Sequence, residues 1–231
     1  MDQFAFQNSC RTTGDLVKNL IAVLVIFLLF GCQTTPPPQS TPSSTPKAAR
    51  PVLVAVGDSL TEGLGVQPEE AYPAQLQARL SEAGLEWEVI NSGVSGETSS
   101  GALTRLDWVL KTKPDAVLLI TGANDGLRGL DPELTRQNLD AIVSELKSQN
   151  IKVMLGGMKA PPNLGDDYTS QFESIYPAVA EKHGVPLIPF FLEGVAKAPE
   201  LNLEDGKHPN PEGYAVIVQN ILEPVKVWLK N

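Results

Sequence analysis

An uninterrupted apolar run from Val52 to Val56 stops abruptly at Gly57-Asp58-Ser59-Leu60, and it constrains this chain more than any other segment. The run is rich in valine and does not alternate with polar residues, which is typical of a strand covered on both faces in a parallel sheet. In open α/β sheets, ligands bind just beyond the carboxyl ends of the strands. The sequence therefore predicts that Ser59 lies at such an edge, where a nucleophile needs a base, an orienting group and oxyanion donors.

Strand and helix signals alternate along the rest of the chain. Asp131-Pro132 and Asn210-Pro211 each combine an N-cap residue with proline at the first helical position. The alternation predicts right-handed crossovers and a three-layer α/β/α domain over residues 51–231 with a five-stranded parallel sheet. Beyond the first strand we expect strands at 86–90, 115–121, 151–158 and 185–189, and helices at 73–83, 100–110, 131–149, 168–183 and 212–222, the last bent or ended by Pro224.

Three later loops carry polar residues suited to a site at the same edge. They are 91–98 with Gly93, 122–126 with Asn124, and 203–212 with Asp205 and His208. His208 is the candidate base, because His183 stands at a helix end before Gly184, where an imidazolium would only favour the helix dipole. Asp58 is interpreted as a brace between loops and not as a catalytic acid.

The amino-terminal fifth of the chain has the pattern of an export signal followed by a tether. Its apolar core, from Leu20 to Phe30, is shorter than the roughly 20 residues of a membrane-spanning helix and suits a signal peptide at 1–31. Leu29 and Gly31 before Cys32 resemble the bacterial lipobox, although Phe30 is bulkier than that pattern usually shows. We expect lipidation of Cys32 and a Pro/Thr/Ser-rich linker at 32–50. An uncleaved anchor is the alternative.

This pattern predicts an exported protein, held on a bacterial membrane by its lipid and facing the periplasm or the cell exterior. Cys10 would leave with the signal peptide, so the mature chain would keep one cysteine and no disulfide. The net charge of -9 argues against nucleic acid and anionic headgroups as electrostatic partners. The two histidines and two cysteines form no metal-ligand spacing, and we expect no metal and no cofactor.

Four blocks of sequence resemble the SGNH hydrolase family, also called GDSL esterases. They are Gly57-Asp-Ser-Leu60, Gly93-Val-Ser-Gly96, Gly122-Ala-Asn-Asp125 and Asp205-Gly-Lys-His208-Pro209, in that order. Ile175-Tyr-Pro177 and Val185-Pro-Leu-Ile-Pro-Phe-Phe191 look closest to the bacterial acyl-CoA thioesterase, lysophospholipase and arylesterase subgroup. Glu97 and Ser99-Ser100 depart from that subgroup's usual Asp and Thr-Ala.

The resemblance implies a flavodoxin-like fold and a serine esterase acting on aryl esters, lysophospholipids or acyl thioesters. It implies Ser59 as nucleophile, His208 as base and then acid, and Asp205 as the group that fixes the imidazole. It also implies an oxyanion hole formed by the backbone N–H groups of Ser59 and Gly93 and the side-chain amide of Asn124.

Other functions remain alternatives at this point. A carbohydrate O-deacetylase or acetyl transferase could use the same scaffold, and so could a non-catalytic surface lipoprotein. A nucleotide-binding module is disfavoured, because the chain has neither a Gly-x-Gly-x-x-Gly turn nor a P-loop. The loops at 159–167 and 197–210 are short and lack an amphipathic stretch, so we expect a cleft without a lid.

Overall fold

The computed structural model describes residues 50–231. The predicted signal peptide, Cys32 and the linker as far as residue 49 lie outside the described residues. Within the described part, no helix combines the length and apolarity needed to cross a membrane.

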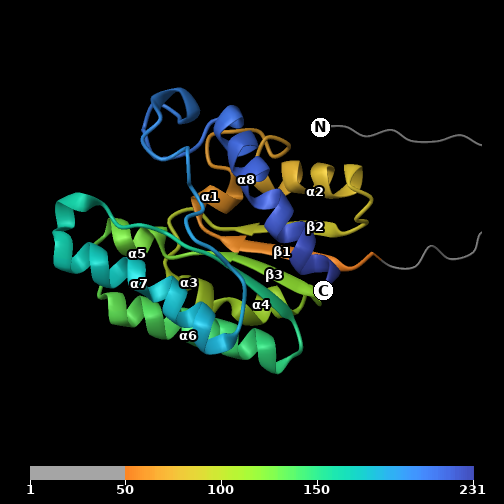
Figure 1. The fold of residues 1–231 in the computed structure, drawn as a ribbon, viewed down its shortest axis with the longest axis horizontal. Coiled ribbons are helices and arrows are strands. Elements are labelled where there is room, and N and C mark those ends of the chain that lie inside the picture. Colours follow the sequence, from red (N-terminus) through yellow and green to blue (C-terminus); the bar gives the residue numbers. More distant parts are fainter. Residues whose placement is uncertain (1–49) are drawn as a thin grey trace, which may run out of the picture. The chain divides into compact units, whose positions relative to one another are not determined.

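A five-stranded sheet forms the centre of the domain, and every neighbouring pair of strands in it is parallel (Figure 1). Its order, β2-β1-β3-β4-β5, places β1 between β2 and β3, so the chain switches direction of travel across the sheet after β2. The predicted fold class is confirmed. The strands are β1 (Val52–Gly57), β2 (Glu88–Gly93), β3 (Ala116–Ile120), β4 (Lys152–Gly156) and β5 (Leu187–Ile188).

Helices cover both faces of the sheet. The pair α2 and α8 packs together on one face, and α6 packs on α7 and α3 on the other (Figure 1). The strands β1, β3 and β4 are buried almost throughout, as expected between two helical layers. The helices are α1 (Ser59–Glu62), α2 (Tyr72–Glu82), α3 (Ser99–Thr104), α4 (Leu106–Leu110), α5 (Ala123–Leu127), α6 (Pro132–Ser148), α7 (Asp166–His183) and α8 (Pro211–Lys230), with 3-10 turns η1 (Pro162–Leu164) and η2 (Pro199–Leu201).

Two helices differ from the prediction. The segment expected as one helix over 100–110 is broken at Arg105, which ends α3 and begins α4. The last helix does not stop near Pro224 but continues to Lys230. A proline inside a helix costs about 3 kcal/mol, whereas each large apolar side chain that is buried contributes about 1.5–3 kcal/mol. Burial of Val225, Trp228 and Leu229 beyond the proline therefore outweighs its cost.

The strand edges also differ. The second strand was expected to end at Ile90, but β2 continues through Asn91 and Ser92 to Gly93, where it still pairs with Gly57 of β1. The fifth strand is shorter than predicted. Both changes follow from pairing with a neighbouring strand, which a single segment's composition does not reveal.

Candidate active site

Ser59 lies at the sharp turn between β1 and α1. The Asp58 side chain caps this short helix by accepting a hydrogen bond from the Leu60 N–H (3.0 Å). Ser59 is the first helical residue, and Gly63 caps the end of α1 in the left-handed conformation (φ 88°). The turn holds the serine at the carboxyl edge of the sheet, with 8% of its surface exposed.

Asp205 and His208 lie on a tight turn closed by a short antiparallel bridge. The bridge joins Asn202 to Pro209, and the Leu203 N–H donates to the His208 carbonyl (2.8 Å). The Asn202 side chain donates to the carbonyls of Val195 and Ala198, both at 2.7 Å, which ties the turn to the preceding segment. The backbone of the candidate base is therefore fixed before any contact with the serine.

The three predicted catalytic side chains form one hydrogen-bonded relay. His208 Nε2 lies 2.9 Å from Ser59 Oγ, and His208 Nδ1 lies 2.5 Å from Asp205 Oδ2. A carboxylate only accepts hydrogen bonds, so Nδ1 carries the proton of the neutral imidazole and Nε2 is left to accept from the serine hydroxyl. The arrangement can remove the Ser59 proton as the oxygen attacks.

The Asp205 carboxyl is held in its ionised form. Its hydrogen bond with the His208 side chain is the main reason that its pKa falls to about 2, and the backbone N–H groups of His208 and Lys207 lower it further. An ionised Asp205 is what the relay requires, because only the carboxylate can stabilise an imidazolium as it forms.

Asn124 is the second residue of α5, directly beyond β3. Its Nδ2 donates to the Glu97 carbonyl (3.0 Å) and, over a longer distance, to Asp58 Oδ2 (3.3 Å). Both amide hydrogens therefore have partners in the free protein. The longer bond is the weaker one, and it is the one that an oxyanion at the serine could replace.

Asp58 is a buried carboxyl beside the nucleophile. Its side chain is fully covered, and burial raises its pKa to about 6. The hydrogen bonds from Leu60 and Asn124 offset only part of that rise. Asp58 contacts the helix cap and Asn124 and takes no part in the relay, as the sequence interpretation expected.

Gly93 is not placed as the sequence suggested. Its N–H donates to Asn91 Oδ1 (2.9 Å), so it is not available to an oxyanion. Gly93 serves a packing role, because a Cβ there would lie 2.0 Å from the Glu62 backbone nitrogen.

Gly96 fits the second backbone donor better than Gly93 does. Within residues 50–231 the N–H groups of Ser59 and Gly96 donate no hydrogen bond. Gly96 also directly precedes Glu97, whose carbonyl accepts a hydrogen bond from Asn124. Gly96 has φ 74°, a conformation that glycine adopts without strain. The hydrogen bond of the Gly93 N–H thus argues against the glycine that the sequence suggested, and Gly96 in the same loop is the candidate donor. A strand ending at Gly93 would have pointed to this later glycine.

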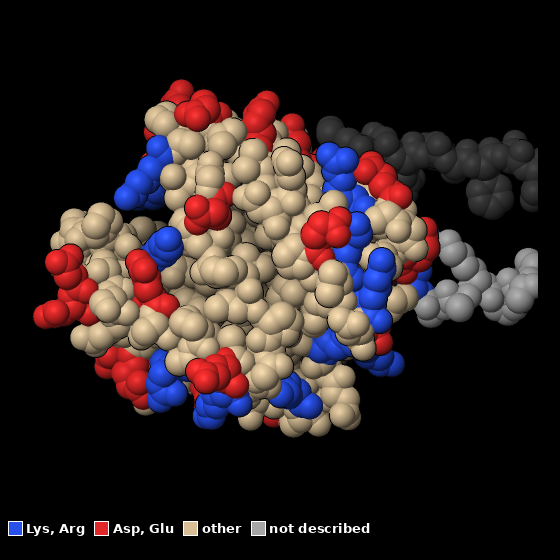
Figure 2. All heavy atoms as spheres, in the orientation of Figure 1, with Lys and Arg blue, Asp and Glu red and all other residues tan. Residues whose placement is uncertain are grey.

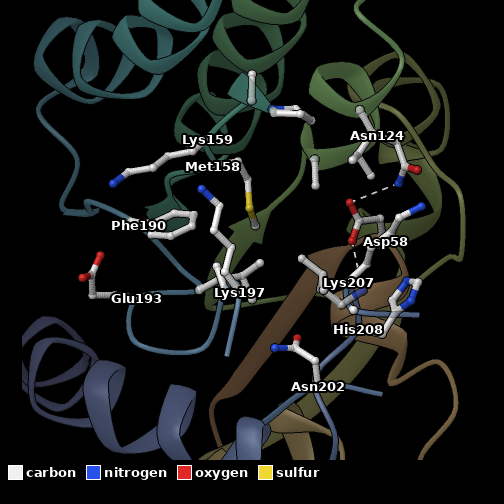
Figure 3. Close-up of a pocket in the computed structure, with 18 of the residues that line it drawn as sticks. Asp58, Asn124, Met158, Lys159, Phe190, Glu193, Lys197, Asn202, Lys207 and His208 are labelled. Atoms are coloured by element: carbon white, nitrogen blue, oxygen red, sulfur yellow. Dashed lines mark hydrogen bonds between the residues drawn. The ribbon is translucent and has the colours of Figure 1, made fainter. Parts of the chain in front are cut away.

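An open cleft of about 710 Å³ begins at Ser59 and His208. Figure 3 shows Met158, Phe190 and Lys197 along the cleft, with Lys159 and Glu193 at the end away from Asp58 and His208. In the space-filling view the hollow lies at the left, with acidic and basic side chains at its rim (Figure 2). The segments at 158–162 and 192–197 line the cleft, whose mouth is open to solvent.

His183 is remote from this site. Its Nε2 lies 2.8 Å from Asp140 Oδ1, a carboxylate that also contacts Lys182. This contact joins the end of α7 to α6, consistent with the structural role expected. No group of three or more His, Cys, Asp and Glu side chains suited to a metal ion occurs between residues 50 and 231.

Comparison with known proteins places this site in a described family. The model of the GDSL-like lipase/acylhydrolase family matches residues 55–216. Esterase TesA of Pseudomonas aeruginosa is 38% identical over 186 residues, covering 80% of this chain and 92% of that protein. An arylesterase of Vibrio mimicus is 40% identical over 172 residues (74% and 86%). Thioesterase 1/protease 1/lysophospholipase L1 of Escherichia coli K12 is 38% identical over 171 residues (74% and 81%).

Solved structures show the same likeness. The crystal structure of TesA is 37% identical with a TM-score of 0.74, covering 77% of this chain and 99% of that one. The SGNH-hydrolase family esterase AlinE4 is 42% identical with a TM-score of 0.67 (78% and 97%). The psychrotrophic esterase EstA from Pseudoalteromonas, in a structure inhibited by monoethylphosphonate, is 34% identical with a TM-score of 0.74 (78% and 99%).

Proposed function

The chain belongs to the GDSL-like lipase/acylhydrolase family, and from that premise we propose that it cleaves carboxylic esters through an acyl intermediate on Ser59. It is a hydrolase acting on ester bonds, and the non-catalytic alternative is set aside by its esterase relatives. The observation that carries the assignment of residues is the continuous relay from Asp205 through His208 to Ser59 Oγ.

The reaction divides into two transfers. In the first, His208 Nε2 takes the hydroxyl proton while Ser59 Oγ attacks the acyl carbon, and the imidazolium then protonates the departing alcohol or thiol. In the second, His208 takes a proton from water as the water oxygen attacks the acyl-serine, and returns it to Ser59 Oγ when the acid leaves. Asp205 stays ionised throughout and stabilises the imidazolium.

The oxyanion of each tetrahedral intermediate needs preorganised donors. We assign the backbone N–H groups of Ser59 and Gly96 and the Asn124 amide to this role, with Gly96 in place of Gly93. The two N–H groups make no other hydrogen bond in the described chain. Asn124 reaches the oxyanion by releasing its 3.3 Å contact with Asp58 while its bond to the Glu97 carbonyl keeps the amide oriented.

The cleft suits a dissolved substrate that has an apolar acyl group. Leu127, Met158 and Phe190 give it apolar walls, and the open mouth exposes Ser59 to dissolved substrate. The names of the relatives make aryl esters, lysophospholipids and acyl thioesters the substrates to test first. We propose small-molecule or lipid esters of this kind as the partners of the site.

Activity-based labelling tests the assignment. The purified domain, residues 47–231, would be treated with a serine-directed fluorophosphonate and assayed on aryl esters and acyl thioesters of graded length and on an O-acetylated oligosaccharide. We expect labelling at Ser59, and loss of both labelling and turnover in Ser59→Ala. General-base help is worth at least about a hundredfold, so His208→Ala should fall at least that far. Retention of more than about a tenth of the activity by either variant would refute the mechanism. Preferential turnover of the acetylated sugar would favour the deacetylase alternative.

We further propose that Cys32 carries a lipid that holds the exported enzyme on a bacterial membrane, facing the periplasm or the exterior. The support is the sequence alone: an apolar signal core, the lipobox-like Leu29-Phe30-Gly31-Cys32 and a linker that cannot pack. Metabolic labelling with a palmitate analogue, compared between wild type and Cys32→Ser, tests it.

A further inference from the structure

Arg105 occupies the break between α3 and α4, next to the loop that contributes Gly96. Its side chain is largely covered (19% exposed), and so is that of Glu97, with which it pairs (6% exposed). The contact is a two-point fork: Nε lies 2.6 Å from Glu97 Oε1, and Nη2 lies 2.8 Å from Glu97 Oε2. A charge pair this well covered has a fixed geometry.

The same guanidinium donates to two strand ends. Nη1 donates to Ser92 Oγ (2.7 Å), and Nη2 donates to the Ser92 carbonyl (2.7 Å) and the Gly57 carbonyl (3.3 Å). Arg105 thus makes five hydrogen bonds to three separate segments: the end of β1, the end of β2 and the loop 94–98.

Two of the three contacted segments lead directly into groups of the proposed oxyanion hole. Gly57 is two residues before Ser59, and Glu97 directly follows Gly96. The Glu97 carbonyl in turn accepts from Asn124 Nδ2. Arg105 therefore contacts the segments that lead to Ser59 and Gly96 directly, and it is linked to Asn124 only through Glu97.

We propose that Arg105 is a positioning residue for the oxyanion hole, acting through Glu97 and Gly57 on the spacing of the Ser59, Gly96 and Asn124 donors. The inference rests on the proposed function and deepens it. Arg105 contacts neither the His208 relay nor the cleft wall. Its effect should therefore be on transition-state stabilisation and not on substrate binding.

The chemistry of the position explains why arginine is needed. A planar guanidinium presents donors in several fixed directions, whereas a lysine ammonium is a single compact charge that cannot span a carboxylate fork and two carbonyls together. Arg105→Lys keeps the charge beside Glu97 but loses this geometry. Arg105→Ala would leave a covered carboxylate without its partner, so Glu97→Gln is the second variant, because it keeps the shape and removes that carboxylate.

The test compares Arg105→Lys and Glu97→Gln with wild type on a short aryl ester, and monitors folding by thermal denaturation. A misplacement of about 1 Å costs about a hundredfold, so we expect kcat to fall about 10- to 100-fold in Arg105→Lys with KM within about twofold. The pH profile of kcat/KM should keep its shape, because the relay is not contacted. Arg136→Lys is the matched control, since Arg136 makes a similar fork to Glu133 on the exposed face of α6 and should leave kcat unchanged.

Outcomes of this test separate the inference from the function it rests on. If wild type and Arg105→Lys are equally active, or if the variants raise KM alone, the positioning role is refuted while the esterase assignment stands. A loss of kcat that only parallels a loss of folded protein in both variants also refutes it. Wild type without esterase activity would instead overturn the proposed function. A kcat of Glu97→Gln that lies between those of wild type and Arg105→Lys would support the positioning role, because the arginine still bridges the two strand ends.

Discussion

Replacement of Asp58 by asparagine should reveal a buried charge that weakens the fold at neutral pH. The carboxyl is fully covered and lies between the Leu60 N–H and the Asn124 amide, with no cation in direct hydrogen-bond contact. Asparagine is as good an N-cap as aspartate, so its side-chain oxygen can keep the bond from Leu60. The variant therefore removes the charge while leaving the cap.

The magnitude follows from the pKa of Asp58, which burial raises from 3.8 to about 6. A difference of about two pKa units corresponds to about 3 kcal/mol, at 1.36 kcal/mol per unit. The folded state holds the Asp58 proton more tightly than the unfolded chain. The free energy of unfolding of the wild type therefore falls by up to this amount as the pH rises from about 4 through about 6. The variant lacks the carboxyl and has no such loss. The stability of Asp58→Asn relative to wild type should thus increase by about 2 to 3 kcal/mol between pH 4 and pH 7.5.

Urea unfolding of both proteins at pH 4 and pH 7.5 measures this change, and the double difference cancels the titration of all other groups. Asp131→Asn is the control, because Asp131 also caps a helix through its carboxylate but is exposed to solvent. A relative stability that stays constant within about 0.5 kcal/mol would show that the Asp58 proton is held no differently in the two states. A decrease with rising pH would show that Asp58 is stabilised as a charge, and would refute the reasoning outright.

Three further outcomes are expected. Asn124→Ala should lower kcat about 10²- to 10³-fold with little change in KM on a short aryl ester, and a rise in KM alone would assign Asn124 to substrate positioning. Cys32→Ser should move the protein from the membrane fraction to the soluble fraction with unchanged activity on dissolved esters; retention in the membrane would favour an uncleaved anchor. Purified residues 47–231 should show simple saturation kinetics on dissolved short-chain esters and poor turnover of emulsified triacylglycerol, because the cleft is open. A sharp rise in rate above the micelle-forming concentration would reveal a mobile cover.

Local sequence determined most of the strands and helices and the pairing of Asp205 with His208. The apolar run before Ser59 predicts a covered strand, and the Asn210-Pro211 pair predicts the start of α8, because caps and strand composition depend on residues close together in the chain. Asp205 and His208 could be paired from the sequence for the same reason, because they are only three residues apart in the chain. The carboxyl edge of a parallel sheet then accounts for the gathering of the catalytic loops.

Only the tertiary structure decided the contacts between distant segments. Ser59 Oγ and His208 Nε2 meet across 149 positions, and the β2-β1-β3 order that allows this comes from strand pairing. Pairing also extends β2 as far as Gly93. The Gly93 N–H donates to the Asn91 side chain, which leaves Gly96 as the candidate donor. The partners of Arg105 were likewise invisible in its own segment, because they come from two strands and a loop. Periodicity reports which face of an element is covered, whereas a hydrogen bond depends on where the packed layers place a group on another segment.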